Sequence, residues 1–335
     1  MESTPTLVDA YHAAGRIRST ILRTPLAEAP ELVRQSGARS AHLKLECLQP
    51  TGSFKIRGAA NKILSLDAPA RKRGVITFST GNHGKAVAYV AGKLGVRAVV
   101  CLSAHVPPYR AEAIRELGAQ VSVKGRSQDE AEENYRQLAV SAGYIPVVPF
   151  DDPMIIAGQG TIALEILSDL PDTDVLLVPL SGGGLLAGIA MAAKTIHPGI
   201  HIVGLSIERS PAMLESLKAG HPVQVEEKDT LADSLLGGIG RSNRYTMPLV
   251  EKYTDEHLLI SEDEIRDGMF TIFDRHRLVV EGAAAVGVGA LINRRIDVKG
   301  KSVVAVLSGS SIQSKLYVSI IRQKLSGVRY KNDGS

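Results

Sequence analysis

The sequence predicts an α/β protein in which parallel strands alternate with helices. Short runs rich in Val, Ile and Leu recur along the chain, and segments with helical patterning follow them. Polar or glycine-rich turns stand at the ends of three of these runs, where open parallel sheets place their ligands. The 335 residues are long for one hydrophobic core. We therefore expect two α/β lobes with a ligand cleft between them.

Residues 51–150 are expected to form the first of these units. Apolar, β-branched runs indicate buried strands, and the segments between them have helical patterning. Strands are expected at 74–78, 98–102 and 119–123, and helices at about 83–94 and 110–117. Two or three such strand–helix units could form one compact domain.

The chain passes into a second unit near Asp151. The expected elements are a helix at about 155–167 and strands at 175–180, 200–207 and 302–307. Ser261 and Glu264 have the spacing of a capping box, which should open a helix that reaches about Arg277. The sequence contains no internal repeat and no long linker.

The composition is that of an ordinary globular protein and argues against several classes. The net charge is +4, the 39 basic and 35 acidic residues are interspersed, and Trp is absent, so a nucleic-acid footprint is not indicated. No apolar run reaches the length of a membrane span. Cys47 and Cys101 lack a CxxC or metal-ligand spacing, so we expect reduced thiols and a cytoplasmic location.

Two loops after predicted strands could bind anions. Residues 79–84 (Ser-Thr-Gly-Asn-His-Gly) precede a helix and suit a carboxylate, although a capping turn without a ligand is an equal alternative. Residues 181–185 (Ser-Gly-Gly-Gly-Leu) can turn several backbone N–H groups toward one phosphate. Gly182 and Gly184, with Glu208 at the end of the next strand, also fit a dinucleotide site.

Lys55 and Ser308 are candidate functional residues because of their positions in the sequence. Lys55 lies between Phe54 and Ile56, and partial desolvation there would lower the pKa of its amine and make it a nucleophile. Ser308 stands at the carboxyl end of the last predicted strand. Either residue alone is more often structural.

Four separated motifs occur in a fixed order along the chain. They are 43–46 leading to 52–57, then 80–84, 181–185 and 230–233. With these motifs the chain resembles the fold type II pyridoxal-phosphate enzymes, specifically the threonine dehydratase and serine racemase family, from Arg23 to Ser308. The resemblance implies a two-lobed architecture similar to the tryptophan synthase β chain. Its open, twisted, mostly parallel sheets would carry helices on both faces, with the cofactor in the interlobe cleft.

The resemblance also implies domain bounds and residue roles. Residues 1–50 and 151–325 would form a large cofactor-binding domain, 51–150 a small substrate-loop domain and 326–335 a tail. Lys55 would hold pyridoxal 5'-phosphate as a Schiff base and act as the catalytic base. The other cofactor-binding residues would be Phe54 on the ring face, Asn82 at the 3-hydroxyl, Ser181, Gly182, Gly183, Gly184 and Leu185 at the phosphate, and Ser308 at the ring nitrogen. The substrate-binding residues would be Ser79, Thr80, Gly81, His83, Asp233 and Ser234.

The implied activity is removal of a β-hydroxyl group from a small hydroxy amino acid, giving a 2-oxo acid and ammonia. A neutral Ser308 would leave the ring nitrogen unprotonated, which favours loss of a β-leaving group over transamination. The run 233–240 resembles the hydroxyectoine-utilisation dehydratases, whose substrate would be a hydroxylated diaminobutyrate derivative. Ser206 stands where some members have a metal-binding glutamate, so no metal is expected. A homodimer is implied.

Several alternatives stay open at this point. A NAD-dependent dehydrogenase would use Gly182, Gly184 and Glu208 but would leave Lys55 and Asn82 without a task. A β-replacement synthase would keep the cofactor and need a second nucleophile. A racemase would need an acid–base group opposite Lys55, where Thr80 stands in place of the serine of racemases. A non-catalytic binding module is the fourth alternative.

Overall fold

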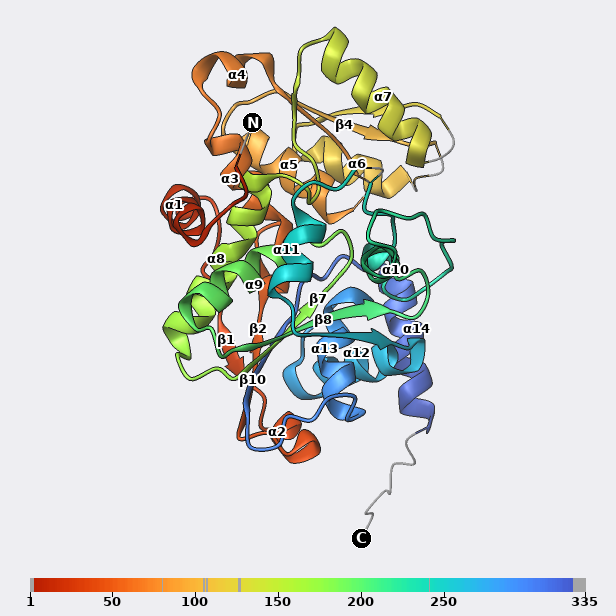
Figure 1. The fold of residues 1–335 in the computed structure, drawn as a ribbon. Helices are drawn as coiled ribbons and strands as arrows, with labels where there is room; N and C mark the ends of the chain where they lie inside the picture. The colour runs from red at the N-terminus through yellow and green to blue at the C-terminus, as the bar shows by residue number, and fades with distance from the viewer. Residues whose placement is uncertain are drawn as a thin grey trace.

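The computed structural model describes residues 3–79, 81–104, 106, 108–125, 128–240 and 242–327. They fold around two sheets (Figure 1). The strands of the large sheet are β1 (Leu26–Glu28), β2 (Ser40–Lys44), β7 (Val175–Pro179), β8 (His201–Ile207), β9 (Glu256–Ile260) and β10 (Ser302–Val306). Their spatial order is β1-β2-β10-β7-β8-β9, and every neighbouring pair is parallel except β1 with β2.

The small sheet is entirely parallel, with the order β5-β4-β3-β6. Its strands are β3 (Val75–Phe78), β4 (Ala98–Leu102), β5 (Gln120–Val123) and β6 (Ile145–Pro146). The α/β class with open, mostly parallel sheets is thereby confirmed. The domain bounds expected from the sequence stay a prediction.

Helices cover both faces of the large sheet, because its central strands are apolar on both sides. Along β10, Val303 and Ala305 face one core, whereas Val304 and Val306 face the other. The first core contains α2 (Pro30–Ser36), α12 (Glu262–His276), α13 (Gly282–Ile292) and α14 (Ser314–Gly327). The second contains α1 (Leu7–Ile17), α8 (Pro153–Asp169), α9 (Gly184–Ile196), α10 (Ala212–Ala219) and α11 (Thr246–Tyr253).

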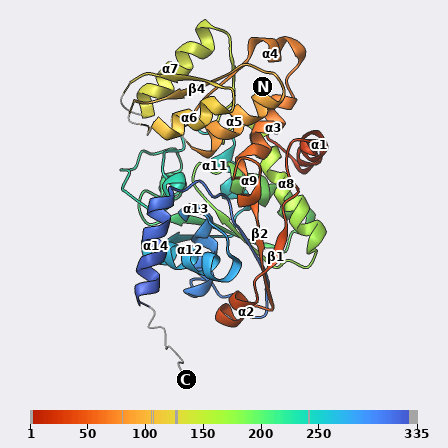
Figure 2. The ribbon, with the colours of Figure 1, turned by 180° about the vertical axis from the view of Figure 1, so that it is seen from behind.

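The small sheet is covered in the same way (Figure 2). One face packs against α3 (Lys55–Leu64), α5 (Asn82–Lys93) and α6 (Pro108–Glu116), and the other against α7 (Gln128–Ser141). The short elements are α4 (Ala68–Arg73) and the 3-10 turns η1 (Glu46–Leu48) and η2 (Asp233–Leu235). Helix α3 also packs against α8, so it joins the two halves of the molecule.

The expected elements agree with the structure to within a few residues. Ser261 caps α12, because its hydroxyl accepts from the Glu264 N–H while the Glu264 carboxylate accepts from the Ser261 N–H at 2.8 Å. The patterns did not indicate the three-residue β1 or the two-residue β6. Among the described residues, no helix is long and apolar enough to cross a bilayer.

Candidate active site

Lys55 is the first residue of α3 and is half-buried. The preceding turn is fixed by the loop after β10, because the Phe54 N–H donates to the Ser308 carbonyl at 3.1 Å and Ser53 forms a β-bridge with Gly309. Lys55 Nζ donates to the Pro149 carbonyl at 2.9 Å and lies 5.2 Å from the centroid of the Phe54 ring. The structure thus places Phe54 in contact with both Lys55 and the Ser308 backbone.

Burial lowers the pKa of the Lys55 amine to about 8, although the negative charge of Glu281 opposes the shift. An amine with that pKa is partly unprotonated near neutral pH. It can therefore act as a nucleophile or as a base, which an ordinary surface lysine cannot do well.

A cluster of four buried charged residues includes Arg57 of α3. We call Lys44, Glu46, Arg57 and Glu165 the ionic cluster. Arg57 donates to both oxygens of Glu46 at 2.7 Å and to Glu165 at 2.7 and 2.8 Å. Lys44 Nζ contacts the same Glu165 at 2.6 Å. Because Arg57 lies two residues after Lys55 on α3, this cluster fixes the start of the helix against η1 and α8.

The loop 181–185 connects β7 to α9 and has the form of an anion site. None of its backbone N–H groups donates to another described residue. Gly183 has φ +88°, which favours glycine, and an added Cβ would lie 2.7 Å from Met213 Cε. A Cβ on Gly182 would lie 2.4 Å from the ring of Phe150. Only glycines allow this turn, and its unused N–H groups suit a phosphate.

The loop 79–84 follows β3 and is folded tightly onto α5. An added Cβ at Gly84 would lie 2.4 Å from the Ser79 carbonyl, and the Gly81 N–H donates to Ser79 Oγ at 3.4 Å. The predicted substrate-binding residue Thr80 lies outside the described residues.

His83 lies in the same loop and is buried. Its Nε2 is 2.9 Å from the Val147 carbonyl, and a carbonyl can only accept, so this nitrogen carries the proton. Burial and the nearby Lys55 charge lower the pKa of His83 to about 3. The ring is therefore neutral, and a substrate carboxylate would not find a cation here.

Glu281 is the central residue of the site that the sequence motifs did not indicate. It precedes α13, is 3% exposed, and accepts hydrogen bonds from Asn82 Nδ2 at 3.0 and 2.9 Å. Ser234 Oγ and the Ser311 N–H also donate to it, at 2.8 and 3.1 Å. We call Asn82, Ser234, Glu281 and Ser311 the Glu281 cluster. A lone carboxylate before an apolar helix was the sequence signal that could have revealed it.

Burial raises the pKa of the Glu281 carboxyl, although the hydrogen bonds from Asn82 and Ser234 oppose the rise. The close fit extends to the backbone. An added Cβ at Gly309 would lie 2.8 Å from Glu281 Oε1, so the carboxylate can approach this loop only because position 309 is glycine.

The two predicted substrate-end residues, Asp233 and Ser234, make different contacts. Asp233 is half-exposed and pairs with Arg110 of α6 at 3.1 Å, whereas Ser234 reaches inward to Glu281. Ser308 is 3% exposed at the end of β10. Glu208, which a dinucleotide site would require, is exposed after β8.

Unpartnered polar atoms supply the test of whether a cofactor fits. Ser53 Oγ, Asn82 Oδ1, His83 Nδ1 and Ser311 Oγ are buried without a hydrogen-bond partner in the described part of the chain. Such atoms are costly unless a ligand or water pairs with them. Together with the unused N–H groups of 181–185 and the Lys55 amine, they match a polar ring that bears an aldehyde and a phosphate.

The segment 147–152, which the motifs also did not indicate, connects these parts. The Val147 and Pro149 carbonyls accept from His83 and Lys55, and Phe150 packs on the glycine loop. Asp151 accepts from the N–H groups of residues 244–246 at 2.7 to 2.9 Å, at the start of α11. One strand-to-helix connection thus positions the amine and the phosphate loop together.

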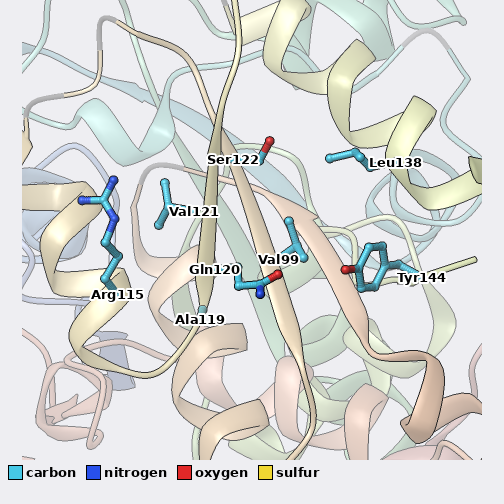
Figure 3. Close-up of a pocket in the computed structure, with 8 residues that line it drawn as sticks. All are labelled: Val99, Arg115, Ala119, Gln120, Val121, Ser122, Leu138 and Tyr144. Atoms are coloured by element: carbon cyan, nitrogen blue, oxygen red, sulfur yellow. The ribbon is translucent and has the colours of Figure 1, made fainter. Parts of the chain in front are cut away.

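Figure 3 shows a separate pocket at the edge of the small sheet. Its lining includes Val121 and Ser122 of β5, Leu138 of α7 and Tyr144. No predicted site residue lines it. The residues we describe contain no group of three or more His, Cys, Asp or Glu placed to hold a metal ion.

Known proteins resemble the chain over nearly its whole length. An L-threonine ammonia-lyase from Thermotoga maritima is 42% identical over 96% of the chain and 79% of that relative. One from Geobacter sulfurreducens is 41% identical over 93% of the chain and 77% of the relative. The structure of maize serine racemase superimposes with a TM-score of 0.89 at 28% identity, covering 97% of this chain and 99% of the other.

The family described as "pyridoxal-phosphate dependent enzyme" matches residues 17–309. That span includes Lys55, the loops 79–84 and 181–185, the Glu281 cluster except Ser311, and Ser308. The chain belongs to the pyridoxal-phosphate-dependent enzymes of the threonine dehydratase type, and pyridoxal phosphate is its cofactor.

Proposed function

We propose that this enzyme removes the β-hydroxyl group of a small hydroxy amino acid and releases a 2-oxo acid and ammonia. The observation that carries the proposal is the Lys55 amine, whose pKa is lowered to about 8 and whose charge acts on His83, a residue with a buried, unpartnered Nδ1 in the described part of the chain. The names of the relatives from Thermotoga maritima and Geobacter sulfurreducens support this reaction class.

The chain's own residues divide the work of binding. The N–H groups of 181–185 would hold the cofactor phosphate, Phe54 the ring face, and Asn82 and Ser308 the polar atoms of the ring. When bound, pyridoxal phosphate supplies an electron sink for negative charge at the substrate α-carbon. The loop 79–84 would bind the substrate carboxylate through hydroxyl and backbone N–H groups, since His83 is neutral.

Lys55 then moves the proton. Its free amine takes the proton from the substrate α-carbon, the electron pair left behind forms a double bond to the β-carbon, and that proton is passed to the departing hydroxyl, which leaves as water. A water molecule is taken up again when ammonia departs, so the net change is amino acid to 2-oxo acid and ammonia. An amine of pKa about 8 suits this task near neutral pH, because both of its protonation states are accessible.

The substrate side chain is the finer part of the proposal. We infer a hydroxylated diaminobutyrate derivative, because Asp233 offers a half-exposed carboxylate beside Ser234 and could meet a second, positively charged group of the substrate. Arg110, which pairs with Asp233, would have to yield this carboxylate. The Asp233→Asn variant should then lose activity on the diamino substrate and keep activity on threonine and serine.

The experiment is a screen of β-hydroxy amino acids for ammonia release. Wild type should release ammonia and Lys55→Ala should release at least about a hundredfold less, the range expected for a lost general base. Lys93→Ala, which changes an exposed lysine of α5, is the matched control. Equal ammonia from wild type and Lys55→Ala would refute the mechanism.

Two further readouts separate the alternatives within the family. Formation of a keto acid only after a thiol is added would indicate β-replacement, and appearance of the D-amino acid would indicate racemisation.

The proposed homodimer is tested by light scattering of the holoenzyme.

A further inference from the structure

We propose that Asp151 is a positioning residue for the cofactor phosphate, because it fixes the first turn of α11 against the glycine loop 181–185. In this role Asp151 does not contact the phosphate. It acts through the helix that packs on Gly183. The inference rests on the proposed binding of the phosphate by 181–185 and does not depend on the substrate side chain.

Helices α9 and α11 both begin beside the glycine loop. Helix α9 starts within the loop, at Gly184, and α11 starts at Thr246. A Cβ added to Gly183 would lie 3.0 Å from Thr246 Cβ and 3.3 Å from Val250 Cγ2, so α11 packs directly against this residue. Two helix N-termini, each of which attracts negative charge, are therefore close together.

The two N-termini differ in whether their backbone N–H groups are used. Those of 181–185 donate to no other described residue. The N–H groups of residues 244, 245 and 246 all donate to the Asp151 carboxylate, at 2.7, 2.8 and 2.9 Å. Tyr245, the N-cap residue of α11, provides no side-chain cap, so a residue 94 positions away along the chain supplies it.

The remaining part of the first turn of α11 is also satisfied by the protein. The Met247 N–H donates to Asn243 Oδ1 at 2.7 Å, and Pro248 has no N–H to donate. The first three positions of α11 therefore offer no N–H group to a ligand. Helix α11 serves as a support for the loop, and the phosphate is left to the N–H groups of 181–185.

The neighbour of Asp151 contacts the same loop directly. Phe150 packs on Gly182 and Gly184, where added Cβ atoms would lie 2.4 and 3.0 Å from it. Two consecutive residues thus support the loop, Phe150 by contact and Asp151 through α11. The preceding carbonyl, of Pro149, accepts from Lys55 at 2.9 Å, so one short segment aligns the amine with the phosphate loop.

The charge of Asp151 makes the direction of the effect informative. A negative charge close to a phosphate would by itself weaken phosphate binding, so neutralising it would strengthen binding. A positioning role predicts the reverse, because without the carboxylate α11 is no longer held against Gly183. The three N–H groups and the positive end of the α11 dipole stabilise the carboxylate where it lies.

The test compares pyridoxal phosphate with pyridoxal, which has the same ring and aldehyde but no phosphate. Equilibrium dialysis of the full-length, cofactor-free protein gives both dissociation constants. The ratio of the pyridoxal constant to the pyridoxal phosphate constant measures what the phosphate contributes. Asp151→Ala removes the cap, whereas Asp151→Asn keeps the side-chain size and one accepting oxygen but not the charge.

We expect the ratio to fall about tenfold in Asp151→Ala and about threefold in Asp151→Asn, as for the loss of charge-assisted hydrogen bonds. Pyridoxal should bind both variants as tightly as wild type. Asp255→Asn is the matched control, because Asp255 also accepts from a backbone N–H, that of Ile202 at 2.7 Å. That contact lies at the start of β8, at the sheet edge opposite the glycine loop, so the ratio should stay at the wild-type value.

Asp151→Asn covers the case that Asp151→Ala does not fold. An unchanged or higher ratio in Asp151→Asn would overturn the inference, and so would an equal loss of affinity for the two ligands, which a purely structural role predicts. If wild type bound both ligands equally, the phosphate site at 181–185 would be refuted and the inference with it. A high wild-type ratio that both Asp151 variants keep would refute the inference alone.

Discussion

The ionic cluster, which includes Arg57 of the helix that begins at Lys55, and the Glu281 cluster, whose carboxylate acts on Lys55, differ in how completely their hydrogen bonds are satisfied. In the ionic cluster, Arg57 and Lys44 place their donors on Glu46 and Glu165. In the Glu281 cluster, Asn82 Oδ1 and Ser311 Oγ are buried and unpaired in the described structure. Both clusters contain buried polar side chains, but among the described residues only the Glu281 cluster has unpaired buried atoms left for a ligand.

This difference separates a structural role from a functional one. A buried polar group without a partner costs free energy, so a fold that retains such groups gains something from them when a ligand binds. A satisfied cluster holds a helix in place and needs nothing more. We therefore expect changes in the ionic cluster to act on stability and changes in the Glu281 cluster to act on cofactor binding.

The largest expected effect is a loss of stability when the ionic cluster is changed. Arg57→Met should lower the free energy of unfolding by about 3–5 kcal/mol, because it leaves Glu46 and Glu165 buried with a deficit of positive charge. Denaturant unfolding of the cofactor-free protein measures this. Arg115→Met removes an exposed pair with Glu112 and should change stability by no more than about 1 kcal/mol. Similar losses for the two variants would break the comparison.

The second largest effect is expected in the Glu281 cluster, on both stability and cofactor affinity. Asn82→Ala should cost about 1–3 kcal/mol of stability, because Glu281 loses one donor group but keeps Ser234 and the Ser311 N–H. Its affinity for pyridoxal phosphate should fall about tenfold. Isothermal titration with the cofactor, set beside Arg57→Met, checks the contrast. A larger stability loss in Asn82→Ala than in Arg57→Met would reverse our assignment of roles.

The third effect is a dependence of stability on pH. The pKa of Lys55 is lowered to about 8 in the folded protein, whereas the unfolded lysine keeps its ordinary value of 10.5. Between these values the unfolded state binds more protons, so this lysine makes stability rise as the pH increases from about 8 to 10.5. Below about pH 8 its buried charge is a constant penalty. The rise should be missing in Lys55→Met when cofactor-free proteins are unfolded at a series of pH values.

The smallest effect is expected at the surface. Arg110→Gln should reduce stability by about 1 kcal/mol or less, because Arg110 and Asp233 are 30% and 49% exposed at their side chains. The difference from wild type should shrink further in high salt. A double-mutant cycle with Asp233→Asn isolates the pair. A coupling energy as large as that of a buried ion pair would contradict this prediction.

Local sequence signals located much of the fold and of the site. The strand at 98–102 and the capping box at Ser261 follow from β-branched residues and from a three-residue spacing, and both are confirmed. The glycines of 181–185 indicated an anion site because their backbone N–H groups can converge, and the structure adds that a Cβ at Gly182 or Gly183 would clash. The dinucleotide alternative was wrong, because glycine spacing reports a phosphate and not the molecule that bears it.

What the sequence alone determined is the set of parts, namely an α/β chain, a lysine between two apolar residues at position 55 and a glycine-rich loop after a strand, all visible from neighbours a few residues away. Only the tertiary structure decided how the pieces face one another. Glu281 lies 199 residues from Asn82, yet its carboxylate accepts from the amide of Asn82 at 3.0 and 2.9 Å. No local pattern could reveal this contact, because residues so far apart along the chain meet only when the folded structure brings them together.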